Sequence, residues 1–380
     1  MGDERGWVGR AAPRFADVRR IAVLRGSGIG DLVQSLPAAE ALAAAYPGAE
    51  LTLLGTPAHV DLLTGRPSPF GVLAALPVAP GIRTGGPEDP AATAAFVDRM
   101  RGRDFDLAVQ LHGGGRSSNP FLLSLGARHT VGSRTADATP LERSRPYLYY
   151  QHEVLRGLEV VALAGAMPVS LEPRLALRPE ERARRASRRP DEPVVVVHPG
   201  ATDPRRQWLP GAFAQVMDGL TERGVRVVVV GSAEDVPVAE AILAAQRRPS
   251  GLASSVAGQQ PLSGLVEQLL GADVVVACDS GPRHVAAALG VRTVGVYWVG
   301  NLVNAGPLGR SRHRVQVSFT SACAVCGADL TQVGWTAERC AHDPSIVADV
   351  DPARVLADVL ELLADARAER TAGGPDGTAG

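Results

Sequence analysis

The sequence contains a series of short, continuous apolar runs, each followed by a polar or glycine-rich loop and then by a helical pattern. The main runs are IAVLR (21–25), LTLLG (51–55), DLAVQL (106–111), VVVVHPG (194–200), VRVVVVGS (225–232), ADVVVACDSG (272–281) and RTVGVYW (292–298). Strands that are apolar on both faces and alternate with helices are typical of parallel sheets covered by helices on both sides. The sequence therefore predicts an α/β fold whose ligands bind beyond the carboxyl ends of the strands.

The 380 residues are enough for two such domains. A segment rich in Arg, Glu and Pro, residues 172–192, has little apolar periodicity and is the predicted linker. We therefore expect two Rossmann-like domains, residues 20–171 and 193–350, which face each other across a cleft. The other predicted segments are a flexible N-terminus (1–19), a C-terminal helix (351–366) that returns to the N-terminal domain, and a disordered Gly-rich tail (367–380).

Charge and composition narrow the function class. The formal net charge is -1, so no overall basic field recruits nucleic acid. All basic Lys/Arg positions are Arg, so a surface Arg by itself is no sign of anion binding. The start MGDERGWVGR has no apolar signal segment, and no apolar run approaches the roughly 18 residues of a membrane span. We expect a cytoplasmic protein with reduced thiols and no transmembrane segment.

The first loop, Arg25 to Asp31, lies between a predicted strand and a predicted helix. Its glycines allow close approach of a ligand to backbone N–H groups. The spacing is GxGxG rather than the dinucleotide GxGxxG, and no acidic residue ends the strand LTLLG, so an NAD-dependent oxidoreductase is a weak alternative. Asp31 at the helix start is either a functional carboxylate or a simple helix cap.

Three loops of the second half also follow predicted strands. Residues 198–208 carry small and hydroxyl-bearing residues and two Arg side chains that could grip a diphosphate. Residues 231–235 carry two carboxylates, which either bind ribose hydroxyls or cap a helix. Residues 279–284 open a helix, and a helix N-terminus is a ready diphosphate site. A Ser280–His284 hydrolase pair is disfavoured because no GxSxG motif surrounds Ser280.

Taken together, these blocks resemble glycosyltransferase family 9, the ADP-heptose:lipopolysaccharide heptosyltransferases. The resemblance spans about residues 20–365. It is carried by IAVLRGSGIGDLVQSLPAAEALAAAYPGAELTLL, DLAVQLHGGGRSS, HEVLRGLEVVALAG, VVVHPGATDPRRQWLPGAFAQV and ADVVVACDSGPRHVAAALGVRTVGVY in that order. It implies a GT-B fold with an acceptor-binding N-terminal domain and a donor-binding C-terminal domain. It also implies an inverting displacement without a metal or other cofactor, in which Asp31 is the general base.

The resemblance assigns further site residues. The expected donor-binding residues are Gly200, Ala201, Thr202, Arg206, Ser232, Glu234, Asp279, Ser280, Gly281 and His284, with Asp235 competing with Glu234. The expected acceptor-binding residues are Ser27, Gly28, Gly30, His112, Gly113 and Arg116. Two features depart from the family: Arg206 stands where a Lys is common, and the loop 112–115 is unusually rich in glycine. The acceptor is therefore a glycan or a small molecule, with peripheral membrane contact if it is a lipid.

Four cysteines complete the candidate residues. Cys323, Cys326 and Cys340, with His342, have the residue types of a zinc site, although the Cys-x-His spacing is unusual. The favoured interpretation is that these are reduced packing thiols and that the protein holds no metal, with a structural zinc as the alternative. Cys278 in a predicted buried strand is expected to behave as a small hydrophobic residue.

The sequence thus predicts a glycosyltransferase that moves a heptose or similar sugar from an ADP-sugar. Two alternatives remain open: a GT-B enzyme, transferase or epimerase, that uses a UDP- or GDP-sugar, and a non-catalytic protein that binds sugar nucleotides.

Overall fold

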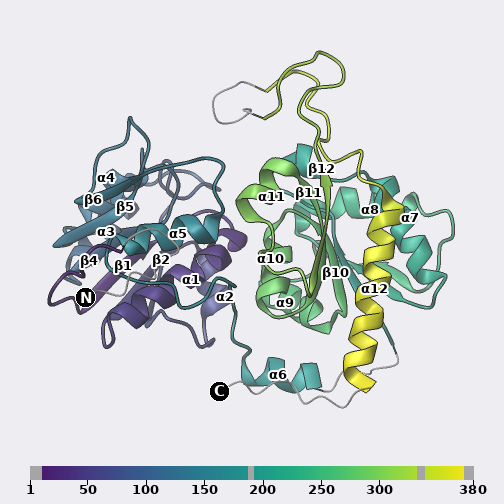
Figure 1. The fold of residues 1–380 in the computed structure, drawn as a ribbon, viewed down its shortest axis with the longest axis horizontal. Helices are drawn as coiled ribbons and strands as arrows, with labels where there is room; N and C mark the ends of the chain where they lie inside the picture. Colours follow the sequence, from purple (N-terminus) through teal and green to yellow (C-terminus); the bar gives the residue numbers. More distant parts are fainter. Residues whose placement is uncertain (1–10, 187–191, 332–338, 372–380) are drawn as a thin grey trace. The chain divides into compact units, whose positions relative to one another are not determined.

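The computed structural model describes residues 11–186, 192–331 and 339–371. The chain divides into two compact units, Met1–Arg178 and Pro179–Gly380. The division falls inside the segment 172–192 that we predicted as a linker, and the second unit starts with a short helix there, α6 (Pro179–Ala186). Within the described residues, each unit is built on one six-stranded sheet (Figure 1).

The first unit alternates strands and helices except for two consecutive strands before its last helix. Its elements are β1 (Arg20–Leu24), α1 (Ile29–Ala45), β2 (Glu50–Gly55), α2 (Pro57–Leu63), β3 (Val72–Ala75), α3 (Pro90–Arg101), β4 (Leu107–Gln110), α4 (Ser118–Ser124), β5 (His129–Arg134), β6 (Arg143–Pro146) and α5 (Glu153–Ala162).

The second unit repeats the pattern after α6. Its further elements are β7 (Val194–His198), the 3-10 turn η1 (Pro204–Arg206), α7 (Pro210–Thr221), β8 (Arg226–Val229), the 3-10 turn η2 (Ala233–Asp235), α8 (Val236–Ala244), β9 (Ala253–Ser255), α9 (Leu262–Gly271), β10 (Val274–Cys278), α10 (Gly281–Ala288), β11 (Arg292–Trp298), α11 (Val299–Ala305), β12 (His313–Ser318) and α12 (Pro352–Thr371).

Both sheets are parallel and share one strand order. The first sheet runs β3-β2-β1-β4-β5-β6, and the second runs β9-β8-β7-β10-β11-β12. This is the order of a doubly wound Rossmann sheet, whose direction of winding reverses between the two central strands. The reversal lies between β1 and β4 in the first unit and between β7 and β10 in the second. Ligands of such sheets bind at the carboxyl ends of these strands.

The core of the second unit lies on both sides of strands that are buried along their whole length. The strand residues of β7, β10 and β11 are all buried, as the continuous apolar runs predicted. In Figure 1, α9 and α10 lie on one side of this sheet, and α7 and α12 lie on the other. Helix α12 packs on α7 because Val355, Val359 and Leu362 are fully buried in the core of this unit. This differs from the prediction that the C-terminal helix returns to the N-terminal domain.

The described residues near both ends of the chain are more ordered than the sequence predicted. Phe15, in the segment expected to be flexible, is buried and stacks on the ring of His129 at a centroid distance of 4.1 Å. Helix α12 continues to Thr371, five residues beyond the predicted end at 366. The rest of both predicted terminal segments lies outside the described residues. Among the described helices, none is both long and apolar enough to cross a lipid bilayer.

Candidate functional site

Asp31 lies in the first turn of α1, directly beyond the carboxyl end of β1. One carboxylate oxygen accepts a hydrogen bond from the backbone N–H of Gly28 at 3.0 Å. The other accepts from the guanidinium of Arg25 at 2.7 Å. The Asp31 side chain is nevertheless 40% exposed. Asp31 is therefore both a helix cap and an accessible, oriented carboxylate, so the two interpretations that the sequence left open are compatible.

Buried Arg25 and partly exposed Glu153 extend the charged network around this carboxylate. Arg25 is only 6% exposed, and its guanidinium also pairs with Glu153 at 3.2 Å. Burial opposes its charge, but Asp31 and Glu153 outweigh that effect and raise the pKa of Arg25 above its ordinary value. Glu153 uses its second oxygen to pair with Arg156. These four charges balance, so Asp31 is held in place by a rigid network rather than by a single contact.

The two glycine-rich loops that we expected to bind the acceptor lie together in the first unit. A Cβ on Gly26 would come 2.8 Å from the ring of His112 and 2.3 Å from the carbonyl of Ile82, so only glycine fits there. His112 follows β4, and its Nε2 is 3.1 Å from the carbonyl oxygen of Gly81. Burial lowers the pKa of His112, and the nearby charge of Arg25 adds to this effect. The loops that carry Gly28 and Gly113, and the first turn of α1 with the buried Gly30, thus border the reversal point of the sheet.

The other two predicted acceptor-binding residues, Arg116 and Ser27, are both exposed. Arg116 is 84% exposed and pairs with Asp137 at 3.7 Å, so no described contact ties it to the Asp31 network. Ser27 has a positive φ of 69°, which places it in the left-handed region that non-glycine residues rarely adopt. His59 of α2, which the sequence analysis did not select, lies 2.9 Å through its Nε2 from the carbonyl oxygen of Gly28.

In the second unit, Asp279 organises a cluster at the carboxyl end of β10. It is buried, and its two oxygens contact Arg206 at 3.1 Å and His284 at 3.2 Å. Burial raises the pKa of Asp279, but the hydrogen bond from His284 and the charges of Arg206 and Arg283 outweigh it and hold the pKa below its usual value. Asp279 therefore stays ionised and fixes Arg206 beside the start of α10.

The proton of His284 can be assigned from its neighbours. A guanidinium nitrogen of Arg283 lies 2.7 Å from Nδ1 of His284. A guanidinium only donates, so Nδ1 accepts and Nε2 carries the proton that is donated to Asp279. With His284 neutral, Arg206 and Arg283 against Asp279 leave the cluster with a net charge of +1 (two positive charges and one negative). Such a cluster at a helix N-terminus favours an anionic group.

A second cluster contains Ser280, His198 and Asp235 of the 231–235 loop. The Ser280 hydroxyl is 3.0 Å from Nδ1 of His198, and burial lowers the pKa of His198 to about 4 despite the opposing charge of Asp235. Asp235 accepts from the backbone N–H and the hydroxyl of Ser232 at 2.8 and 2.9 Å. A Cβ on Gly200 would come 2.1 Å from an oxygen of Asp235. Asp235 thus has hydrogen-bond partners within the unit, whereas the neighbouring Glu234 is exposed.

The remaining predicted donor residues lie on the loop between β7 and η1. Thr202 is exposed, and Ala201 accepts a long hydrogen bond from the amide of Gln207 at 3.4 Å through its carbonyl oxygen. The loop is anchored below by Trp208, which is buried and donates its backbone N–H to the sulfur of Cys278 at 3.3 Å. Cys278 is fully buried, as expected, and burial raises the pKa of its thiol to about 12.

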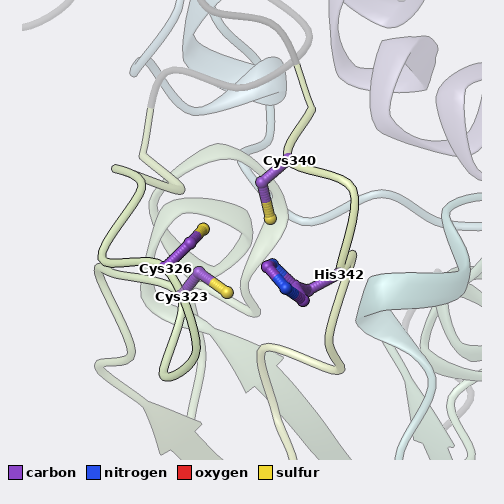
Figure 2. Close-up of side chains that lie close together, drawn as sticks. All are labelled: Cys323, Cys326, Cys340 and His342. Atoms are coloured by element: carbon purple, nitrogen blue, oxygen red, sulfur yellow. The ribbon is translucent and has the colours of Figure 1, made fainter.

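The structure also gathers the other three cysteines. The ligand atoms of Cys323, Cys326, Cys340 and His342 all lie within 4.8 Å of one another (Figure 2). All three thiols are free. Cys323 is buried, whereas Cys326 and His342 are exposed. These four side chains are of the residue types that bind zinc.

Several residues of these clusters were missed by sequence reasoning. Arg25, Glu153, His198 and Arg283 lie within the quoted motifs, but a chain whose basic residues are all Arg gives no reason to select one of them. The position of a residue in the sequence does give a usable signal for site residues. Arg25 and His198 each end a predicted strand at the reversal point of a sheet. Glu153 could not be found in this way, because it begins the distant helix α5.

Comparisons with known proteins identify the family of this chain. The profile of Glycosyltransferase family 9 (heptosyltransferase) matches residues 93–331, more than half of the chain. Lipopolysaccharide heptosyltransferase 1 of Pseudomonas aeruginosa is 26% identical over 324 residues, which cover 81% of this chain and 86% of that protein.

Two solved structures show the same fold. The Escherichia coli ADP-heptose lps heptosyltransferase II has a TM-score of 0.69 at 22% identity, with 91% of this chain and 99% of that chain covered. The dodecameric iron-containing heptosyltransferase TibC of enterotoxigenic E. coli, in complex with ADP-D-beta-D-heptose, has a TM-score of 0.54 at 12% identity, with 93% and 78% covered. The expected GT-B fold of two Rossmann-like domains is confirmed. The chain belongs to glycosyltransferase family 9, the heptosyltransferase family, and is a glycosyltransferase.

Proposed function

We propose that this chain transfers a heptose, or a closely related sugar, from an ADP-linked donor to a hydroxyl group of a glycan or small molecule, with inversion and without a metal in the chemical step. The observation that carries the proposal is Asp31. Its carboxylate is fixed by Arg25 and by the N–H of Gly28, yet it remains 40% exposed at the reversal point of the first sheet. An oriented and accessible carboxylate is what a general base requires.

In the proposed step, Asp31 accepts the proton of the acceptor hydroxyl. The acceptor oxygen forms a bond to the anomeric carbon from the face opposite the donor phosphate. The bond between the anomeric carbon and the phosphate oxygen breaks, and ADP leaves with the electron pair. The loops that carry Ser27, Gly28, Gly30, His112 and Gly113 would hold the acceptor, and Arg116 stays a weaker candidate because it pairs with Asp137 instead.

The second unit would hold the donor. Negative charge grows on the diphosphate as ADP leaves, and the start of α10 at Ser280 and Gly281 presents backbone N–H groups with a favourable dipole. Arg206 adds a guanidinium that Asp279 holds in place. Glu234 is the proposed ribose ligand because its side chain is exposed, whereas Asp235 is used by Ser232. Gly200, Ala201 and Thr202 complete the proposed phosphate loop.

The names of the relatives support ADP-heptose as the donor. The E. coli relative is titled an ADP-heptose enzyme, and the TibC structure contains ADP-D-beta-D-heptose. The Pseudomonas and E. coli proteins are named for lipopolysaccharide, so a lipid-linked glycan is one acceptor to test. Thermal-shift measurements with ADP, UDP and GDP separate the donor alternatives, because selective stabilisation by ADP is expected.

The central test is Asp31→Asn. Asparagine keeps a hydrogen-bond acceptor for Gly28 or Arg25 but cannot take up the proton, so kcat should fall by about 100- to 10,000-fold. The ADP-induced thermal shift should stay unchanged because Asp31 belongs to the other unit. Asp61→Asn, at an exposed position of α2, is the matched control and should keep wild-type kcat. Normal turnover by Asp31→Asn would exclude this residue as the base.

A further inference from the structure

Three cysteines and one histidine of the second unit converge although they come from two separate stretches of chain. Cys323 and Cys326 follow β12, and Cys340 and His342 precede α12. Their four potential ligand atoms lie within 4.8 Å of one another (Figure 2). In a tetrahedral zinc site with bonds of about 2.3 Å, neighbouring sulfur ligands are about 3.8 Å apart. Small side-chain rotations would therefore bring all four groups onto one ion.

The first stretch is a tight turn that directs two thiols toward the same point. Its ends pair through an antiparallel bridge between Ala322 and Asp329. Within it, the N–H of Cys323 donates to the carbonyl of Ala328 at 2.9 Å, and the N–H of Gly327 donates back to the carbonyl of Cys323 at 2.8 Å. Gly327 has a φ of 72°, so a glycine directly after the second cysteine lets the chain reverse there.

The second stretch is anchored on the loop that carries Arg206. Asp343, next to His342, lies 3.5 Å from the guanidinium of Arg205. The Ser345 hydroxyl donates to the carbonyl of Gln207 at 2.8 Å, and the N–H of Ile346 donates to the carbonyl of Arg205 at 2.8 Å. These bonds hold both residues that flank Arg206 in sequence.

The exposure of the cluster argues against simple packing. Cysteine is among the most buried residue types when it acts as a small hydrophobic residue. Here only Cys323 is buried; Cys326 and His342 are exposed and Cys340 is intermediate. The described parts of the segment between β12 and α12 contain a single isolated bridge and no helix or strand. A stretch with so little secondary structure and few buried side chains is commonly held together by a metal or a disulfide.

We propose that Cys323, Cys326, Cys340 and His342 bind one structural metal ion in tetrahedral geometry, either Zn²⁺ or Fe²⁺. Three thiolates and an imidazole are the soft donor set that these two ions accept. Binding releases the three thiol protons, and the neutral histidine supplies its ring nitrogen. The ion joins the turn after β12 to the stretch before α12, and through that stretch it braces the Arg205–Gln207 loop.

Elemental analysis of the purified, tag-free full chain tests the proposal. We expect about one zinc or iron per chain, with zinc giving a colourless protein and ferric thiolate giving a coloured one after oxidation. Cys326→Ser and Cys340→Ser should lose the ion. Cys278→Ala is the matched control, because it removes the one cysteine outside the cluster and should keep the ion. Equal metal content in all four proteins would overturn the proposal.

A second measurement on wild-type protein avoids dependence on variants that fail to fold. Chain stripped by a chelator under reducing conditions is offered Co²⁺ without oxygen, and a thiolate-to-cobalt absorption band with intense tetrahedral visible bands is expected. A mercurial reagent should then abolish the bands in proportion to three thiols per chain. If stripped wild-type protein takes up neither Zn²⁺, Fe²⁺ nor Co²⁺, the site does not exist.

The proposed effect of the ion on the Arg205–Gln207 loop can be measured separately. This measurement rests on the proposed role of Arg206 in donor binding. Metal-free wild-type protein should show a lower Tm and a higher KM for the ADP-sugar, with a smaller change in kcat. Metal content is measured independently of activity. If removal of the bound ion leaves KM unchanged, the bracing is refuted. If the purified protein binds no ion at all, the metal site itself is refuted. An inactive but metal-loaded wild-type protein would instead contradict the proposed function.

Discussion

Replacement of Arg206 tests how the second unit stabilises the leaving diphosphate. Arg206 and Arg283 against Asp279 give the cluster a net charge of +1, and Arg206→Ala reduces this to zero. It also leaves the buried Asp279 carboxylate facing the proposed phosphate site with only His284 as a described partner. Removal of one preorganised donor to a developing negative charge costs about 100- to 1,000-fold in kcat, or about 3–4 kcal/mol. We expect Arg206→Ala to fall in this range.

Arg206→Lys is the informative companion variant. The described contact between Arg206 and Asp279 uses a single guanidinium nitrogen, at 3.1 Å, rather than a two-bonded fork. A lysine ammonium can replace a single-point contact, although it cannot replace a fork. We therefore expect Arg206→Lys to retain kcat within about tenfold, which corresponds to about 1.4 kcal/mol.

The assay is continuous detection of released ADP with an ADP-sugar donor and a competent acceptor, with circular dichroism to confirm that both variants fold. The two variants together distinguish the effect of the positive charge from the effect of the guanidinium geometry. If Arg206→Lys is as slow as Arg206→Ala, the guanidinium shape matters and the point-charge argument fails. If Arg206→Ala turns over at the wild-type rate, Arg206 does not stabilise the leaving group at all.

Three further predictions concern stability. Gly200→Ala places a Cβ 2.1 Å from Asp235 and should cost about 1–3 kcal/mol in urea unfolding, whereas Gly211→Ala, with nothing within 4 Å, should cost nothing. Burial lowers the pKa of His59 to about 4, so the unfolded chain takes up a proton between pH 6.5 and 4 that the folded chain does not. Stability should fall as pH drops through that window, and His59→Gln should make the pH dependence of the unfolding midpoint shallower; an unchanged slope would contradict the burial argument. Leu362→Ala should lower the unfolding free energy of the second unit by about 2–5 kcal/mol, and a cost near zero would show that α12 does not belong to that core.

The architecture of this protein could be predicted from its amino-acid pattern. Short continuous apolar runs bounded by turn residues favour buried strands covered on both faces, and their alternation with helices favours parallel sheets. Both the strand at 194–198 and the strand at 274–278 follow directly from this pattern. The order of the five motif blocks pointed to the family that the profile match then showed. Local chemistry was readable too, because a carboxylate such as Asp31 at a helix start is visible from neighbouring residues alone.

Which residues act together became apparent from the folded chain alone. Glu153 supports Arg25 across 128 positions of sequence, and Asp279 holds Arg206 across 73. The proximity of Asp235 to His198, at 3.8 Å, likewise joins two loops that are distant in sequence. The packing surface of α12 was also undetermined, because an amphipathic helix carries the same apolar face whichever core receives it. Sequence specifies which groups prefer burial or a charge partner, whereas the partner itself is fixed only when the sheets bring distant loop ends to one edge.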